Sequence, residues 1–328
     1  MGSTFKLLNI TSFVNERFVL LFMKLHQSDY RNNKKGAAIP HLNKNVFYEM
    51  PFPIPPMEEQ ERIVAKIEEL LPMVDRYEEA WNKLETFNKK FPVDMERSVL
   101  KLAMQGKLTK QLQTDSNVDE LLNLIKTTKK DYCLKFNKKY KSIECSGEYD
   151  TLNEIPDNWR IVSLSDLCLE IGDIDHNMPK SVAEGIPFVS AKDILDDNSI
   201  SFKDIKYISI TDYERLSKKM KPQINDIIFS RIGTLGKVGY VTENTIFLPS
   251  YSCCVIRNAG INLKYLGFCL QGPEMQKRVK DAKTGIGVPD LGMAMIRSFA
   301  IPVPPIEEQE RIVAKLEELL PLCRKLIK

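Results

Sequence analysis

Two segments of the chain carry apolar residues that alternate four and three positions apart, with charged residues between them. In the first segment these residues are Ile63, Ile67, Leu70, Val74, Tyr77, Trp81 and Leu84, and in the second they are Ile312, Leu316, Leu319, Cys323 and Leu326. This spacing gives a helix one narrow apolar stripe, which is typical of coiled coils. We expect the two helices to pair with each other or with matching helices of a partner. The alternative is that each helix packs on its own domain.

Both helices begin within a sequence that occurs twice. Residues 53–71 read PIPPMEEQERIVAKIEELL, and residues 302–320 read PVPPIEEQERIVAKLEELL. Proline pairs lead into helices, and the acidic residues that follow them suit a helix N-terminus. Pro72 and Pro321 fall inside the apolar pattern, so we expect each to kink its helix or to begin a new segment. The repetition predicts two copies of one unit.

The similarity extends upstream of the two helices. Gly36 and Pro40 precede the first copy at the same distances at which Gly285 and Pro289 precede the second. Each copy is expected to contain a helix, a basic turn with glycine, a strand and then the long helix. The expected strands are VFYEM in the first copy and MIRSFA in the second. We therefore interpret residues 1–52 as the C-terminal remnant of a domain.

Between the repeats the pattern changes to short runs rich in β-branched residues, separated by Gly, Pro, Asn and Asp, which favours strands. The predicted fold class is α+β, a mixed α/β domain with long coiled-coil spacer helices in a pseudo-repeat architecture. The expected parts are the remnant at 1–52, a long central spacer helix region at 53–112, a basic linker at 113–157, a complete domain at 158–301 and a truncated distal spacer helix at 302–328.

Composition is that of an ordinary globular protein. The 328 residues are 43% hydrophobic and 28% charged, with a net charge of +3, which alone does not indicate a nucleic-acid-binding protein. The seven cysteines form no CxxC pair, and there are three histidines, so we expect reduced thiols and no metal site. The apolar run from Phe18 to Leu25 is too short to span a membrane and contains Lys24. A cytoplasmic location is expected.

The linker is the most basic part of the chain. Between Lys126 and Lys141 there are seven lysines and one acidic residue, interspersed with Tyr132, Phe136 and Tyr140. One interpretation is a solvated, partly helical connector. The other is a surface that contacts nucleic-acid phosphates.

Two glycine-rich turns are the candidate functional segments of the complete domain. The first, SRIGTLGKVG at Ser230–Gly239, lacks the spacing of a phosphate-binding P-loop, and the second, KTGIGVPDL at Lys283–Leu291, lacks that of a dinucleotide fingerprint. The first is either a plain hairpin turn or a tight loop that presents Arg231 and Lys237 to DNA bases and phosphates. The sequence contains no convincing catalytic constellation, so we predict that the chain is not an enzyme.

Four sequence patterns, one of which occurs twice, resemble those of the specificity subunits of type I restriction–modification systems. They are PxPPxxEQxRIVxKxEEL at 53–70 and 302–319, SVLKLAMQGKL at 98–108, IPDNWRIVSLSDL at 155–167 and DIIFSRIGTLGKVGYV at 226–241. The resemblance implies target-recognition domains that each read half of a split DNA site, followed by helices that set the spacing. It also implies docking of methyltransferase subunits and of a restriction and translocase subunit. S-adenosylmethionine, ATP and Mg would belong to those partners, and no cofactor is expected in this chain.

The chain departs from that pattern because only one recognition domain is complete. One hypothesis is a homodimer that rebuilds a symmetric reader of double-stranded DNA. Others are a truncated or silent cassette, and a structural coiled-coil adaptor without DNA specificity of its own. The residues expected to contact DNA lie in loops of the complete domain and are Lys180, Ser181, Lys192, Ser230, Arg231, Thr234, Lys237, Lys283 and Thr284.

Overall fold

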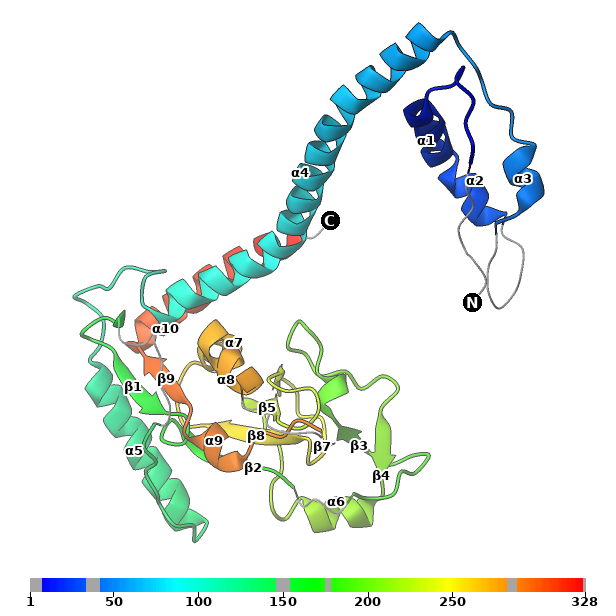
Figure 1. The fold of residues 1–328 in the computed structure, drawn as a ribbon. Coiled ribbons are helices and arrows are strands. Elements are labelled where there is room, and N and C mark those ends of the chain that lie inside the picture. Colours follow the sequence, from blue (N-terminus) through cyan, green and yellow to red (C-terminus); the bar gives the residue numbers. More distant parts are fainter. Residues whose placement is uncertain (1–7, 34–41, 146–153, 175–177, 282–287, 327–328) are drawn as a thin grey trace. The chain divides into compact units, whose positions relative to one another are not determined.

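The computed structural model describes residues 8–33, 42–145, 154–174, 178–281 and 288–326. The chain divides into two compact units, Met1–Lys89 and Lys90–Lys328, and helix α4 (Met57–Met104) contributes residues to both (Figure 1). None of the helices in the described ranges combines the length and the apolar content that a membrane span requires.

The first unit consists of helices. It contains α1 (Glu16–Leu25), α2 (Gln27–Asn32), α3 (Lys44–Tyr48) and the N-terminal part of α4. Asn15 caps α1, because its side-chain oxygen accepts hydrogen bonds from the first free backbone N–H groups of the helix. The ring of Phe52 lies 5.7 Å from that of the buried Phe18 and 4.7 Å from that of Phe22. These aromatic contacts fix α1 against the segment that leads into α4.

The expected strand at VFYEM is a short helix instead. Asn43 accepts a hydrogen bond from the N–H of Asn45 and so caps α3, which favours helix over strand at this point. The corresponding segment of the second copy also begins as a helix, α9 (Met293–Arg297), and only its last residue, Ala300, enters strand β9 (Ala300–Val303). The two copies therefore agree with each other, although the expectation of a strand was wrong for the first and holds only at Ala300 for the second.

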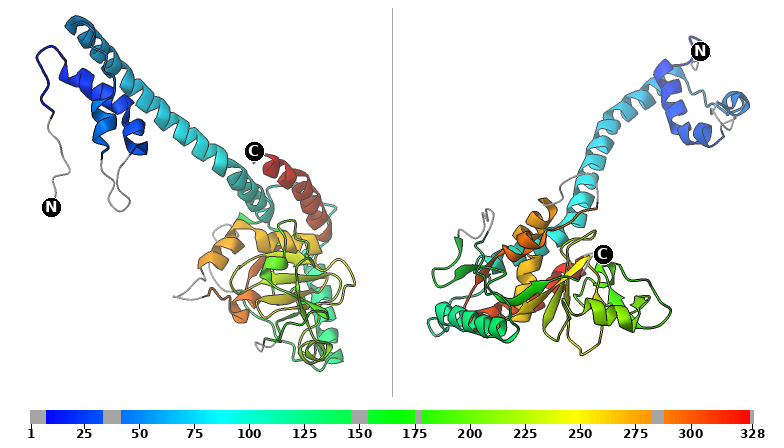
Figure 2. Two further views of the ribbon diagram at one scale, coloured as in Figure 1. Left: turned by 90° about the vertical axis from the view of Figure 1, so that its right-hand side faces the viewer. Right: turned by 90° about the horizontal axis from the view of Figure 1, so that it is seen from below.

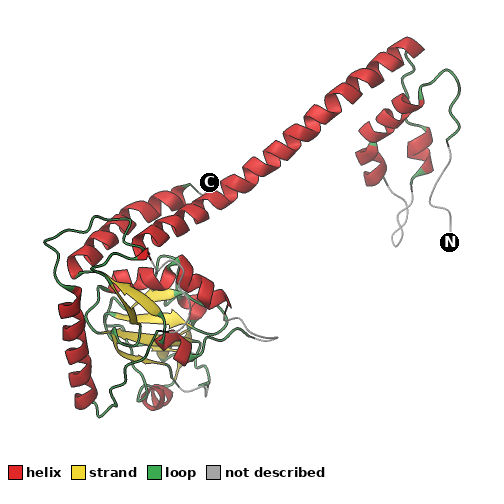
Figure 3. Ribbon diagram, turned by 60° about the vertical axis from the view of Figure 1, so that its left-hand side comes forward, coloured by secondary structure: helices red, strands yellow, loops and turns green. Residues whose placement is uncertain are grey.

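The second unit contains three small sheets (Figure 3). Strand β1 (Arg160–Ser163) pairs antiparallel with β9. The largest sheet has the order β2-β8-β5-β6, all antiparallel, and the third has the order β4-β3-β7, in which β3 and β7 are parallel. The strands of these two sheets are β2 (Cys168–Gly172), β3 (Ile186–Val189), β4 (Lys206–Ile208), β5 (Asp226–Ser230), β6 (Val238–Tyr240), β7 (Leu248–Pro249) and β8 (Cys253–Asn258).

Helices surround these sheets. They are α5 (Val118–Lys135), the 3-10 turn η2 (Ala191–Asp193), α6 (Ile210–Leu216), α7 (Leu263–Gln271), α8 (Pro273–Asp281) and α10 (Ile306–Lys325). Helix α7 supplies Tyr265, which is fully buried and donates its hydroxyl hydrogen to the carbonyl oxygen of Pro302 on β9 at 2.8 Å. The rings of Phe229 on β5 and Phe299 beside β9 meet edge to face at 6.3 Å. This core holds β9, and with it the start of α10, against the main sheet.

The apolar stripe of α10 is buried within its own unit. Ile312 and Leu316 are fully buried, and Leu319 is partly buried, in the core cluster that also contains Val99 and Leu100 near the end of α4. Helix α10 runs beside this last part of α4, and Arg324 forms an ion pair with Glu96 at 3.0 Å (Figure 2). Helix α10 therefore packs within its own unit and also beside the C-terminal part of α4, so the two expectations do not exclude each other for this helix.

The stripe of the first copy differs. Ile63 and Ile67 are half-buried, whereas Leu70, Val74 and Tyr77 are exposed. Pairing through these five residues stays a prediction. The prolines begin no new segments, because Pro72 lies inside α4 and Pro321 inside α10.

Candidate functional site

The first glycine-rich turn is a tight hairpin that joins β5 to β6. The backbone N–H of Ser230 donates to the carbonyl oxygen of Lys237 at 3.0 Å, and its hydroxyl accepts from the N–H of Lys237 at 2.8 Å. Gly233 and Gly236 have φ angles of 77° and 79°, a left-handed conformation that glycine adopts without steric cost. Within the described residues, a Cβ on Gly233 would meet no atom within 4 Å, so the tip of the hairpin is open on that side.

Arg231 fixes this hairpin to neighbouring segments of the protein through its side chain. Its side chain is 5% exposed, and its guanidinium forms ion pairs with Asp290 at 2.7 Å and Asp173 at 3.4 Å. The same group donates to the carbonyl oxygens of Leu291 and Tyr251. The guanidinium is thus bound to protein groups rather than presented at the surface, which differs from the expected contact with bases.

Backbone hydrogen bonds join the hairpin to the end of the second glycine-rich turn. Gly233 N–H donates to Pro289 O at 2.9 Å, and Leu291 N–H donates to Arg231 O at 2.8 Å. Together with the ion pair between Arg231 and Asp290, these bonds attach residues 289–291, at the described end of the second turn, to the hairpin. Lys283 and Thr284, expected to contact DNA, lie outside the described residues.

A third segment brings η2 into the same neighbourhood. Ser250 N–H donates to the carbonyl oxygen of Val189, the last residue of β3, at 2.6 Å. Two residues later, the carbonyl oxygen of Ser252 accepts from the N–H groups of both Arg231 and Ile232. The segment 250–252 therefore connects the hairpin of one sheet to the end of β3 in the other, directly before η2.

The remaining predicted residues differ in exposure. Thr234 at the hairpin tip is exposed, as are Lys180 and Ser181 before β3. Lys192 in η2 has a side chain that is 63% exposed. Lys237 is half-buried because its ammonium group donates to Ile194 O at 2.7 Å and lies 3.8 Å from Asp196 Oδ1. Ser230 is fully buried and serves the hairpin itself.

Sequence reasoning missed a buried polar network at the end of β5 and β8 that lies away from the hairpin. Arg257 on β8 forms a two-point ion pair with Asp226 on β5, at 2.9 and 3.2 Å, and donates to the hydroxyl of Tyr132 on α5. Burial raises the pKa of Asp226, although its bonds to Arg257 oppose the rise. Burial likewise raises the pKa of Tyr132, helped by its hydrogen bond to Glu170. No spacing in the sequence signals these partners, which lie on four separate elements.

In the described part of the chain, no cluster of His, Cys, Asp and Glu could hold a metal ion. Burial raises the pKa of Cys253 and Cys269 to about 12, so both thiols stay protonated and unreactive near neutral pH. The arrangement instead presents hydroxyl and ammonium groups on loops that a rigid sheet holds in place.

Comparison with known proteins gives a consistent family. The family described as the type I restriction modification DNA specificity domain matches residues 3–85 and 156–328, which include both copies of the repeat. The EcoBI specificity subunit of Escherichia coli is 23% identical over 93% of this chain and 59% of its own length. The MjaVIII specificity subunit of Methanocaldococcus jannaschii is also 23% identical, over 93% of this chain and 64% of its own length.

Two solved structures align with most of this chain at low similarity. The HsdS subunit of Thermoanaerobacter tengcongensis is 20% identical with a TM-score of 0.41, covering 96% of this chain and 64% of its own. The S subunit of M. genitalium is 13% identical with a TM-score of 0.35, covering 96% and 69%. The chain thus spans about three fifths of the curated relatives that it matches.

Proposed function

Because the chain belongs to the type I restriction modification DNA specificity domain family, we propose that it is a sequence-specific DNA-binding subunit that directs partner enzymes to their target. The observation that carries this proposal is the extent of the family match. It covers residues 3–85 and 156–328, which include both copies of the repeat, and not one isolated motif. Methylation and cleavage are assigned to partner subunits, and this chain carries out recognition without catalysis.

The surface around the hairpin is the proposed reader. Thr234, Lys180, Ser181 and Lys192 have side chains free to reach DNA, and we assign them direct contacts. Lysine ammonium groups attract phosphates at any sequence, whereas specificity requires contacts to base edges, which suits Thr234 at the hairpin tip. Arg231 is assigned the role of holding the hairpin, because its guanidinium already has protein partners. Lys283 and Thr284 stay candidates from the sequence alone.

The exposed stripe of α4 is the proposed assembly surface. Val74, Tyr77 and Trp81 are 57%, 67% and 54% exposed, and the rings of Tyr77 and Trp81 stack at 6.2 Å. An apolar helix face of this kind suits a second helix. A second copy of the chain and a methyltransferase subunit are the proposed occupants, with a restriction subunit joining the assembled complex. The complex would work in the cytoplasm, where its partners have ATP and S-adenosylmethionine.

The same stripe favours a second candidate function. A structural coiled-coil adaptor would use α4 to hold protein partners and would bind no DNA. The two functions differ in one measurement, because a DNA reader has an affinity for duplex DNA that falls steeply with salt and an adaptor has none.

Methylome sequencing tests the main proposal. A host that carries the chain and its methyltransferase partner is compared with the deletion of this chain. A split methylated motif present only with the chain supports recognition, and identical methylomes contradict it.

Light scattering of the complex tests assembly. A complex that contains only one chain and one methyltransferase subunit excludes the homodimer. Val74→Lys should weaken assembly, with the exposed Lys66→Glu, outside the stripe, as a control.

A further inference from the structure

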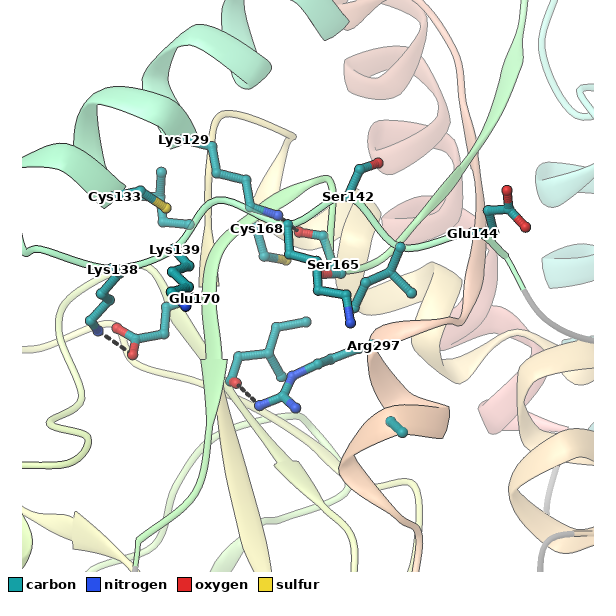
Figure 4. A pocket seen from close by; sticks show the side chains of 15 residues that line it. Lys129, Cys133, Lys138, Lys139, Ser142, Glu144, Ser165, Cys168, Glu170 and Arg297 are labelled. Atoms are coloured by element: carbon teal, nitrogen blue, oxygen red, sulfur yellow. Dashed lines mark hydrogen bonds and ion pairs between the residues drawn. The ribbon is translucent and has the colours of Figure 1, made fainter.

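The lysine-rich segment at 126–141 lines a pocket that the proposed reader does not use. The pocket has a volume of about 680 Å³ and lies between the C-terminal part of α5, the chain that follows it, strand β2 and helix α9. Figure 4 shows Lys129, Lys138, Lys139 and Arg297 around it. Five cationic side chains line the pocket, the fifth being Lys141, against the two carboxylates of Glu144 and Glu170. The excess positive charge favours an anion.

Protein partners hold three of these cations. Lys129 is buried, and its ammonium group donates to the carbonyl oxygen of Ser165 and lies 3.6 Å from Asp166 Oδ1. Lys138 pairs with Glu170. Arg297 donates from one Nη to the carbonyl oxygen of Ile171 at 2.9 Å, an arrangement that leaves its other Nη without a bond to a described residue. These contacts fix positive charge in the wall of the pocket without filling it.

Lys139 and Lys141 differ from these three cations because they have no protein partner among the described residues. Both side chains are exposed, and neither makes a hydrogen bond or ion pair with any described residue. They stand in the chain after α5 where it crosses the pocket, next to Ser142, whose hydroxyl donates to Asp166 at 2.6 Å. That bond ties the crossing segment to the wall. Two unneutralised ammonium groups are thus held close to the fixed positive charge.

The lining indicates which anion would fit. In the described ranges no aromatic side chain lines the pocket, so a nucleobase would have no ring on which to stack. Lysine ammonium groups act as point charges and can bind a phosphate from many directions. Such binding suits a phosphate group of a nucleic-acid strand better than a small ligand that needs specific contacts on all sides. A backbone phosphate of a nucleic acid meets both conditions.

Helix α9 connects this pocket to the proposed reader. Leu291, whose N–H donates to Arg231 O in the hairpin anchor, is two residues before the first residue of α9. Arg297, the last residue of the same helix, lies in the pocket. One short helix therefore carries the hairpin anchor at one end and a pocket cation at the other.

Resting on the proposed DNA-binding function, we propose that this pocket binds a phosphodiester of the DNA backbone through Lys139 and Lys141. The contact supplies affinity at any sequence, whereas the hairpin and η2 supply discrimination. The lysine-rich segment is then a clamp for one DNA strand and not only a connector.

The test compares two double variants of the full chain on the same DNA. Lys139→Gln with Lys141→Gln removes the pocket charges, and Lys126→Gln with Lys135→Gln removes two exposed charges of the same segment that do not line the pocket. Binding to a non-target duplex is measured across a salt series, which requires no knowledge of the target sequence. Circular dichroism and thermal unfolding confirm that each variant is folded.

The pocket variant should bind about tenfold more weakly at low salt. Its plot of log affinity against log salt should be shallower by about 1, since the pocket binds one phosphate and each phosphate contact contributes about 0.9 to the slope. The control should keep the parent slope. An equal change in both double variants, or none in the pocket variant while the parent binds DNA, overturns the pocket assignment alone. A parent without DNA affinity overturns the proposed function as well. Binding of orthophosphate to the parent, with DNA affinity unchanged in the pocket variant, assigns the pocket to a free anion instead and also overturns the proposal.

Discussion

The side-chain oxygen of Gln309 accepts a hydrogen bond from the backbone N–H of Asn262 at 2.9 Å, and Gln60 makes the same bond with Asn15 at 2.8 Å. In both copies the amide nitrogen of the glutamine also donates to a proline carbonyl oxygen five residues earlier. Asn262 and Asn15 are the N-caps of α7 and α1. Each glutamine, fully buried, therefore joins the start of a long helix to the start of an earlier helix, α1 in the first copy and α7 in the second.

Replacing Gln309 by alanine should destabilise the second unit by about 2–4 kcal/mol. The change leaves the N–H of Asn262 buried without an acceptor and removes the donor to Pro304, and each buried unsatisfied group costs about 1–3 kcal/mol. Urea unfolding measures the loss. Gln309→Glu should cost at least as much near neutral pH, because a carboxylate can accept from Asn262 but faces Pro304 O without a donor and places an unpaired charge in a fully buried site beside Glu308.

Glu308 should be far more sensitive than its counterpart Glu59. Glu308 is fully buried and accepts hydrogen bonds from Trp159 Nε1 at 2.9 Å, from Gln111 at 2.8 Å and from Thr109 at 3.1 Å, whereas Glu59 is exposed. Glu308→Gln places an amide NH₂ among these donors and should cost about 1–3 kcal/mol. Glu59→Gln should change stability by less than about 0.5 kcal/mol. Thermal unfolding followed by Trp fluorescence compares them, and equal shifts would contradict the assigned network.

Acid should weaken the attachment of the linker to α10. The hydrogen bonds from Arg311 to Asp115, at 2.7 and 2.8 Å, lower the pKa of Asp115 below its ordinary value of 3.8. A carboxyl with a lowered folded-state pKa stabilises the fold above its unfolded pKa and loses that effect as pH falls through the folded value. The difference in unfolding free energy between the parent and Asp115→Asn should therefore be largest above about pH 4 and shrink below it. A difference that is constant from pH 3 to pH 7 contradicts this linkage.

Arg231 and Thr234 should affect recognition in different ways. Arg231→Ala removes the anchor and leaves Asp290 and Asp173 without this cation, so both stability, by about 2–4 kcal/mol, and discrimination of the target should fall. Thr234→Ala alters only the exposed tip, so discrimination should fall with stability unchanged. Unfolding and competition binding on the same proteins separate the two roles. Loss of discrimination in Arg231→Ala without loss of stability would instead favour a direct DNA contact.

The repeat and its helices could be predicted from the sequence, because an apolar stripe and a duplicated stretch are local patterns. The stripe alone could not reveal its partner: Ile312 and Leu316 pack beside Val99 and Leu100 in the core of their own unit. The error at VFYEM has a local cause, since the capping bond from Asn45 to Asn43 outweighs the strand preference of valine, phenylalanine and tyrosine.

The candidate site was predictable as a pair of glycine turns but not as an exposed surface. Whether Arg231 faces solvent depends on Asp173 and Asp290, which lie 58 and 59 positions away in the sequence. No periodicity encodes such a meeting. The same is true of the pocket, where the lysine count was visible in the sequence but the facing Arg297 was not.

The buried carboxylate of Glu308 sets a condition for exchanging modules. Its three donors come from the segment that follows α4, at Thr109 and Gln111, and from the opening of the recognition domain, at Trp159, while the carboxylate itself lies on the spacer helix α10. A chimera that carries a foreign recognition domain will pack on this spacer with the parent's stability only if it has an indole or an equivalent hydrogen-bond donor at the position of Trp159. Compatibility between reader and spacer thus depends on a few hydrogen bonds, which a designer can check before any target sequence is known.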